Sequence, residues 1–123
     1  HFMKAFNIVR IEHTDGWGMF RWNTATGDRY TVGDSAETMG MYEKHSVRPT
    51  PFADGIDRKE DMFCAFETLE TFNGLIDKDE LKYLFSQGFK VLLITVKKYV
   101  RGNYQVCYKK QDVLTTTDIS SLF

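Results

Sequence analysis

The chain has 123 residues, of which 42% are hydrophobic, 15% aromatic and 27% charged. This length fits one domain, and this apolar content is sufficient for a hydrophobic core, so we exclude a disordered chain. The 16 basic and 17 acidic side chains give a net charge of −1, and no apolar run reaches the roughly 18–20 residues that cross a bilayer, which excludes a membrane protein.

The first two residues, His1 and Phe2, precede Met3 and are predicted to be a tag remnant, so that residues 3–123 form a single globular domain. Residues 4–11 are rich in β-branched and aromatic residues and are predicted to form a strand. The dipeptide at 15–16 is Asp-Gly, which favours a tight turn, and residues 17–22 are predicted to return as a second strand.

The middle of the chain is predicted to contain a short helix, a loop and a strand. Asp34 followed by Glu37 resembles a capping box and predicts a helix start. Residues 46–60 are predicted to be a loop that holds both prolines, and the unbroken apolar run at 62–66 indicates a buried central strand.

Two further helices are predicted from their capping residues. Thr68 is expected to cap the first, and Asp77 with Glu80 to begin the second, which ends at Gly88. Residues 89–100 are predicted to form one long strand that turns at 101–103 and returns over 104–110. The tail at 113–123 has too little periodicity to be assigned.

Strands and helices are grouped along the chain rather than strictly alternating, which predicts an α+β fold. We expect a small single domain with a mostly antiparallel sheet, two to three short helices and a C-terminal β-hairpin. The sequence leaves the oligomeric state open.

Metal binding and covalent catalysis find little support in the sequence. Apart from His1, only His13 and His45 could supply imidazole ligands, no Cys-x-x-Cys motif is present, and no metal site is predicted. Cys64 and Cys107 lie in apolar surroundings, where one disulfide between them is an alternative to two buried, reduced thiols. We expect reduced thiols that react slowly until the protein is denatured.

One candidate binding surface is the proline-stiffened loop at 45–55. His45, Arg48 and Asp54 place an imidazole, a guanidinium and a carboxylate on a restrained backbone, as binding loops often do. The alternative is a structural crossover with Phe52 in the core. Under the binding interpretation, Arg48→Ala abolishes partner binding without loss of stability, whereas Phe52→Ala lowers stability.

The second candidate surface is the predicted terminal hairpin, which concentrates cations and tyrosines. Residues 89–123 carry six basic and two acidic groups, whereas residues 51–88 carry four and nine. The residues proposed to contact phosphates and bases are Lys97, Lys98, Arg101, Lys109 and Lys110, with Tyr99, Tyr104 and Tyr108. The alternative is an edge hairpin whose lysines prevent aggregation.

Several dispersed motifs resemble one family. They are Asp15-Gly16-Trp17-Gly18, Arg48-Pro49-Thr50-Pro51, Phe63-Cys64-Ala65-Phe66, Gly88-Phe89-Lys90-Val91 and Gly102-Asn103-Tyr104-Gln105-Val106. The chain thereby resembles, from Met3 to about Lys110, a family of small uncharacterised proteins encoded by bacteriophages and prophages. The resemblance implies a product that acts in the bacterial host cytoplasm and implies no particular activity.

A weaker similarity is to the ADP-ribosyltransferase fold. That resemblance implies NAD as the cofactor, with Arg10, Thr68 and Gln105 at the places of the family's functional residues. Gln105 stands where those enzymes carry a glutamate, and an amide cannot supply the charge that stabilises an oxocarbenium-like transition state.

Three functions therefore remain open from the sequence. We favour a non-enzymatic accessory protein that binds a host or phage protein, without a cofactor and without a membrane. The alternatives are an NAD-dependent transferase, or an inactive nucleotide-binding relative of one, and a nucleic-acid binder that uses the basic hairpin.

Overall fold

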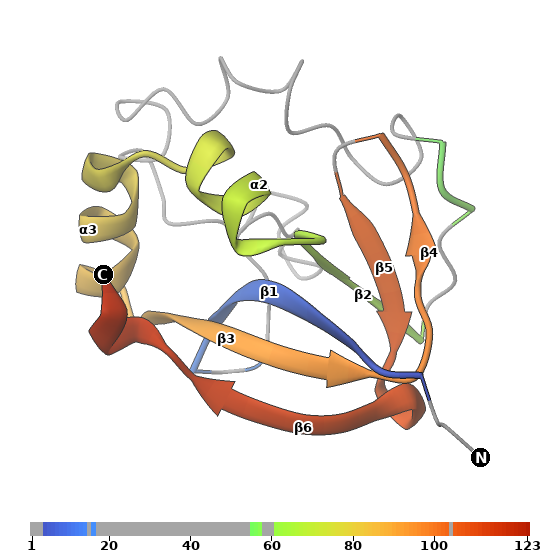
Figure 1. The fold of residues 1–123 in the computed structure, drawn as a ribbon. Helices are drawn as coiled ribbons and strands as arrows, with labels where there is room; N and C mark the ends of the chain where they lie inside the picture. The colour runs from blue at the N-terminus through green and yellow to red at the C-terminus, as the bar shows by residue number, and fades with distance from the viewer. Residues whose placement is uncertain (1–3, 15, 17–54, 58–60, 104) are drawn as a thin grey trace, which may run out of the picture.

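The computed structural model describes residues 4–14, 16, 55–57, 61–103 and 105–123 (Figure 1). The strands are β1 (Phe6–His13), β2 (Met62–Ala65), β3 (Phe89–Val96), β4 (Val100–Arg101), β5 (Val106–Lys109) and β6 (Val113–Asp118). The helices are α2 (Leu69–Leu75) and α3 (Lys78–Ser86), with single 3₁₀ turns at Lys110–Asp112 and Ser120–Leu122. The predicted α+β class is confirmed. Within the described ranges, no helix is long and apolar enough to cross a membrane.

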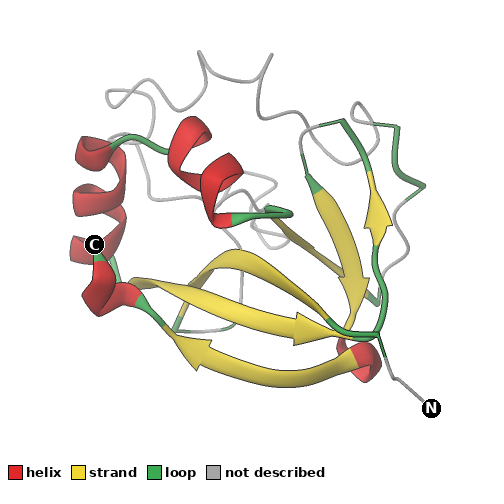
Figure 2. Cartoon of the chain, viewed as in Figure 1, coloured by secondary structure: helices red, strands yellow, loops and turns green. Residues whose placement is uncertain are grey.

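The strands form two antiparallel sheets of three strands each. The first sheet has the order β1-β3-β6 and the second the order β2-β5-β4. A β-bridge between Val9 and Phe66 joins the two sheets. The backbone N–H of Val9 donates to the carbonyl oxygen of Phe66 at 2.8 Å, and the N–H of Phe66 donates to the carbonyl oxygen of Val9 at 2.7 Å. Figure 2 shows α2 and α3 toward one end of the first sheet and the second sheet toward the other.

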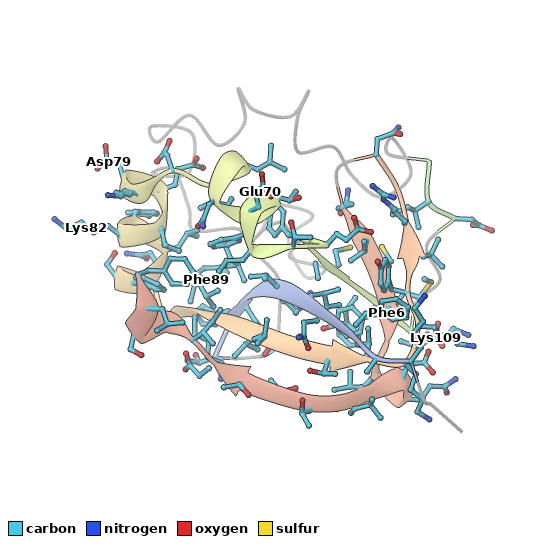
Figure 3. All side chains as sticks on the ribbon, in the orientation of Figure 1. Phe6, Glu70, Asp79, Lys82, Phe89 and Lys109 are labelled. Carbon is cyan, nitrogen blue, oxygen red and sulfur yellow. The ribbon has the colours of Figure 1, made fainter. Side chains whose placement is uncertain are left out.

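The central strand of the first sheet, β3, is covered on both faces, which explains why it is apolar almost throughout, whereas the edge strand β6 is largely exposed. Side chains alternate between the two faces of a strand. Val9 and Val91 belong to one face and pack with Phe72 and Leu84 of the helices in a first core cluster. The opposite face packs against the second sheet in a second cluster, which contains Ile8, Ala65, Leu92, Ile94, Val96, Val106 and Tyr108. Phe89 lies in the first cluster, while Asp79 and Lys82 project outward from α3 (Figure 3).

The signals predicted for α2 and α3 are confirmed. The Oγ1 of Thr68 accepts a hydrogen bond from the N–H of Thr71 at 3.0 Å, and the Oδ1 of Asp77 accepts one from the N–H of Glu80 at 2.8 Å. Gly88 follows α3 with a φ of 88°, a conformation that favours glycine, and a Cβ there would lie 3.1 Å from a ring nitrogen of His13.

Two strand predictions are wrong in detail. The strand predicted over 89–100 ends at Val96, and β4 begins only at Val100 in the other sheet, so that the terminal hairpin consists of β4 and β5 alone. β2 lies at an edge of its sheet, not at the centre. The tail, which the sequence left unassigned, supplies β6. The strand predicted at 17–22 and the helix predicted from Asp34 lie outside the described residues.

Candidate binding site between the two sheets

A hollow of about 580 Å³ opens between the two sheets. Its described wall consists of Glu12, Gly16, Phe63, Leu92, Ile94, Tyr108, Lys110, Val113 and Thr116. This volume lies within the ~300–1,000 Å³ range of small-ligand sites. The wall combines apolar side chains with the polar groups of Glu12, Tyr108, Lys110 and Thr116. The hollow is therefore a candidate binding site in the part of the chain that the structure describes.

Strand register explains why these residues share one wall. Leu92 pairs with Arg10 and Ile94 with Thr116, and cross-strand partners point to the same face of a sheet. Phe63 pairs with Tyr108 in the second sheet, and their ring centroids are 5.9 Å apart. The wall thus combines side chains from β1, β2, β3, β5 and β6.

Arg10 lies behind the wall of the hollow and bonds to its residues. Its Nε donates to the Oε1 of Glu12 at 3.0 Å, its Nη1 to the carbonyl oxygen of Cys64 at 2.7 Å, and its Nη2 to that of Gly16 at 3.3 Å. The guanidinium carbon lies 5.2 Å from the ring centroid of Phe63, within the range of a cation–π contact. Only 4% of Arg10 is exposed. The residue therefore holds β1 to β2 and contacts three residues of the wall, Glu12, Gly16 and Phe63.

Tyr108 supplies a buried hydroxyl to the same wall. Only 5% of the residue is exposed, and burial raises the pKa of its phenol to about 12. The charges of Glu12 and Cys64 also raise this pKa, while the positive charge of Arg10 opposes the shift. Tyr108 is consequently neutral at physiological pH and can serve a ligand as hydrogen-bond donor or acceptor.

The raised pKa of Tyr108 predicts an alkaline loss of stability. In the unfolded chain the phenol loses its proton near its ordinary pKa of 10, whereas the folded protein keeps it until about pH 12. The buried phenol of Tyr108 therefore makes its full contribution to the free energy of unfolding below pH 10. That free energy falls by about 2 kcal/mol between pH 10 and pH 12. Urea unfolding across this range should show the fall in the wild type and a shallower fall in Tyr108→Phe. Equal slopes would contradict the assignment.

The three residues implied by the transferase similarity occupy separate elements. Arg10 lies on β1 and bonds to Glu12, Cys64 and Gly16, as described above. Thr68 caps α2 through its hydroxyl oxygen. Gln105 lies in the turn before β5, where its carbonyl oxygen accepts from the N–H of Gly102 at 2.8 Å. Each of the three thus contributes to the fold.

The basic residues of the predicted hairpin are divided between two environments. Lys97 and Lys98 lie in the connection between the sheets, where the N–H of Lys97 donates to the carbonyl oxygen of Asp112 at 2.9 Å. The Nε of Arg101 lies 3.2 Å from the Oε2 of Glu67, and the Nζ of Lys109 lies 3.8 Å from the Oδ2 of Asp61. Acidic partners therefore compete with phosphate at Arg101 and Lys109, two of the five predicted basic residues.

The tyrosines of that surface are largely used by the fold. Tyr108 is buried between the sheets, so it is not available to stack on a base. Tyr99 packs edge-on against Phe6 with ring centroids 5.2 Å apart, and its hydroxyl donates to the Oε2 of Glu67 at 2.8 Å. Partial burial, together with Glu67, raises the pKa of Tyr99. Tyr104 lies outside the described residues.

The proline loop proposed from the sequence, with His45, Arg48 and Asp54, also lies outside the described residues. The hollow was not predicted. Its one local signal is the alternation in β1, where the polar Arg10 and Glu12 continue the face that Phe6 and Ile8 begin. Among the described residues, no group of three His, Cys, Asp or Glu side chains is arranged to hold a metal ion.

Comparison with known protein families assigns nearly the whole chain to one family model. A family model described as "Bacteriophage T4 Y00F protein" matches residues 3–121, which is nearly the full length. Neither a curated protein nor a solved structure matches the chain. The match agrees with the resemblance that the sequence motifs carry, and it extends that resemblance past Lys110.

Proposed function

Because this chain belongs to the bacteriophage T4 Y00F protein family, we propose that it is a phage-encoded accessory protein that binds and modulates a host or phage protein without catalysing a reaction. The bacterial cytoplasm is the compartment in which such a product acts. The hollow between the sheets is the observation that carries the binding role.

The wall of the hollow suits a segment of a protein partner. Phe63, Leu92 and Ile94 offer apolar contact, and aromatic side chains are prominent where proteins bind one another tightly. Glu12 and Lys110 place opposite charges on the same wall. A partner residue with an apolar side chain beside a polar or charged group would match both features.

A variant that fills the hollow tests this proposal. Thr116 is exposed and lines the hollow, whereas Thr117 is exposed on the opposite face of the same strand. We expect Thr116→Trp to weaken binding at least about tenfold, a loss of roughly 1.4 kcal/mol, and Thr117→Trp to bind as the wild type does. The partner is first captured from host lysate and identified by mass spectrometry, and its affinity is then measured for the three proteins.

Two outcomes would contradict the proposal. Equal affinity of both tryptophan variants would place the binding surface elsewhere, for example on the loop that carries Arg48. Transfer of label from NAD to a lysate protein, abolished in Arg10→Ala, would instead show the transferase function. We expect no such transfer, since Arg10 bonds to three acceptors of the protein itself.

A further inference from the structure

Cys64 and Cys107, which are 43 residues apart in the sequence, lie side by side in the second sheet. They are direct partners in the register of β2 and β5, and their Sγ atoms are 3.6 Å apart. No disulfide joins them in the structure. Both thiols belong to a small core cluster with Met62 and Ile56, on the face of the second sheet opposite the face that lines the hollow. The pair is therefore separate from the candidate binding site.

The backbone places this pair at a position where side chains approach closely. Phe66 exchanges both of its backbone hydrogen bonds with Val9 of β1. The backbone N–H and C=O groups of residues two apart in a strand point toward the same neighbouring strand. The backbone groups of Cys64 therefore point toward β1, and its carbonyl oxygen accepts a hydrogen bond from Arg10. Cys64 and Cys107 consequently form a non-hydrogen-bonded pair of the antiparallel ladder, the type with the shorter distance between opposite residues.

We propose that these two residues are an oxidisable dithiol, which a small disulfide of the glutathione type converts into a disulfide between β2 and β5. The bond would tie the edge strand β2 to the central strand of its sheet (Figure 1). Because Phe63 precedes Cys64 and lines the hollow, the bond would also fix one wall of that hollow.

The order of the two steps follows from burial. Cys107 is fully buried, whereas Cys64 is partly exposed. We therefore expect Cys64 to react in the native protein, unlike the slow reaction of both thiols that the sequence predicts. The Cys64 thiolate attacks the small disulfide, forms a mixed disulfide and releases one thiol. Cys107 then loses its proton and attacks the sulfur of Cys64, which releases the second thiol. Two electrons and two protons pass from the protein to the reagent, which leaves as two molecules of glutathione.

The experiment exposes the full-length native protein to excess glutathione disulfide, with intact mass and thiol counting after denaturation as the readouts. We expect the wild type to lose both thiols and two hydrogens without retaining glutathione. Digestion should yield a cross-linked peptide pair that contains Cys64 and Cys107. In Cys107→Ser, one glutathione should remain on Cys64, because the thiol that displaces it is missing.

Cys64→Ser is the matched control, and we expect its buried Cys107 to stay unmodified until denaturant is added. The cross-linked peptide of the wild type tests the proposal even where a serine variant fails to fold. Three results would overturn it: a wild type that keeps both thiols, a wild type that retains glutathione, or a disulfide that joins two chains.

Discussion

Replacement of Phe72 by alanine is expected to lower the free energy of unfolding by about 3–5 kcal/mol, the usual cost of truncating a fully buried phenylalanine. Phe72 has no exposed surface. Its ring contacts those of Phe66 and Phe123 edge-on, with centroids 5.5 Å and 5.4 Å away. One side chain thus connects α2 to the residue after β2 and to the end of the chain. Urea unfolding of the two proteins measures the difference.

Leu69 is the matched control on the same helix. It is 41% exposed, so we expect Leu69→Ala to change stability by no more than about 0.5 kcal/mol. Phe72 belongs to the core cluster under the helices, on the face of the first sheet opposite the hollow. A loss below about 1 kcal/mol in Phe72→Ala would show that this cluster does not hold the helices to the sheet.

The elements predicted correctly are those with local signals. Thr68, Asp77 and Gly88 mark helix ends through their own hydrogen bonds and conformation, and the structure confirms all three. The end of β3 has no such signal, because Lys97, Lys98 and Tyr99 continue a pattern compatible with a strand. The strand ends after Val96 because the residues on either side of this point pair with different sheets. Val96 still pairs with β6, whereas Val100 pairs with Cys107 in the other sheet.

The candidate site escaped prediction for the same physical reason. Glu12, Phe63, Tyr108 and Thr116 lie on four strands that are distant in the sequence, and only the register of those strands brings them to one wall. The alternation of polar and apolar residues shows which residues of one strand share a face, but it does not show with which other strand that strand pairs. The proximity of the two cysteines depends on register in the same way.

The second large effect is expected for Arg10→Ala, which should lower the free energy of unfolding by about 3 kcal/mol. The substitution removes three hydrogen bonds and the cation–π contact with Phe63. It also leaves the partly buried carboxylate of Glu12 and the carbonyl of Cys64 without their donor, and losing one partner of a buried charged pair is costly.

The variant Arg10→Lys distinguishes the contribution of the positive charge to stability from that of the guanidinium geometry. Lysine keeps the positive charge, but its ammonium cannot reproduce the planar fork that reaches Glu12, Cys64 and Gly16 together, so we expect an intermediate loss. Glu12→Gln should cost less than either, because the carboxylate is 23% exposed and water can replace part of its pairing. If Arg10→Lys were as stable as the wild type, charge alone would account for the anchor. If Glu12→Gln matched Arg10→Ala, the ion pair would outweigh the two carbonyl contacts that join β1 to Cys64 and Gly16.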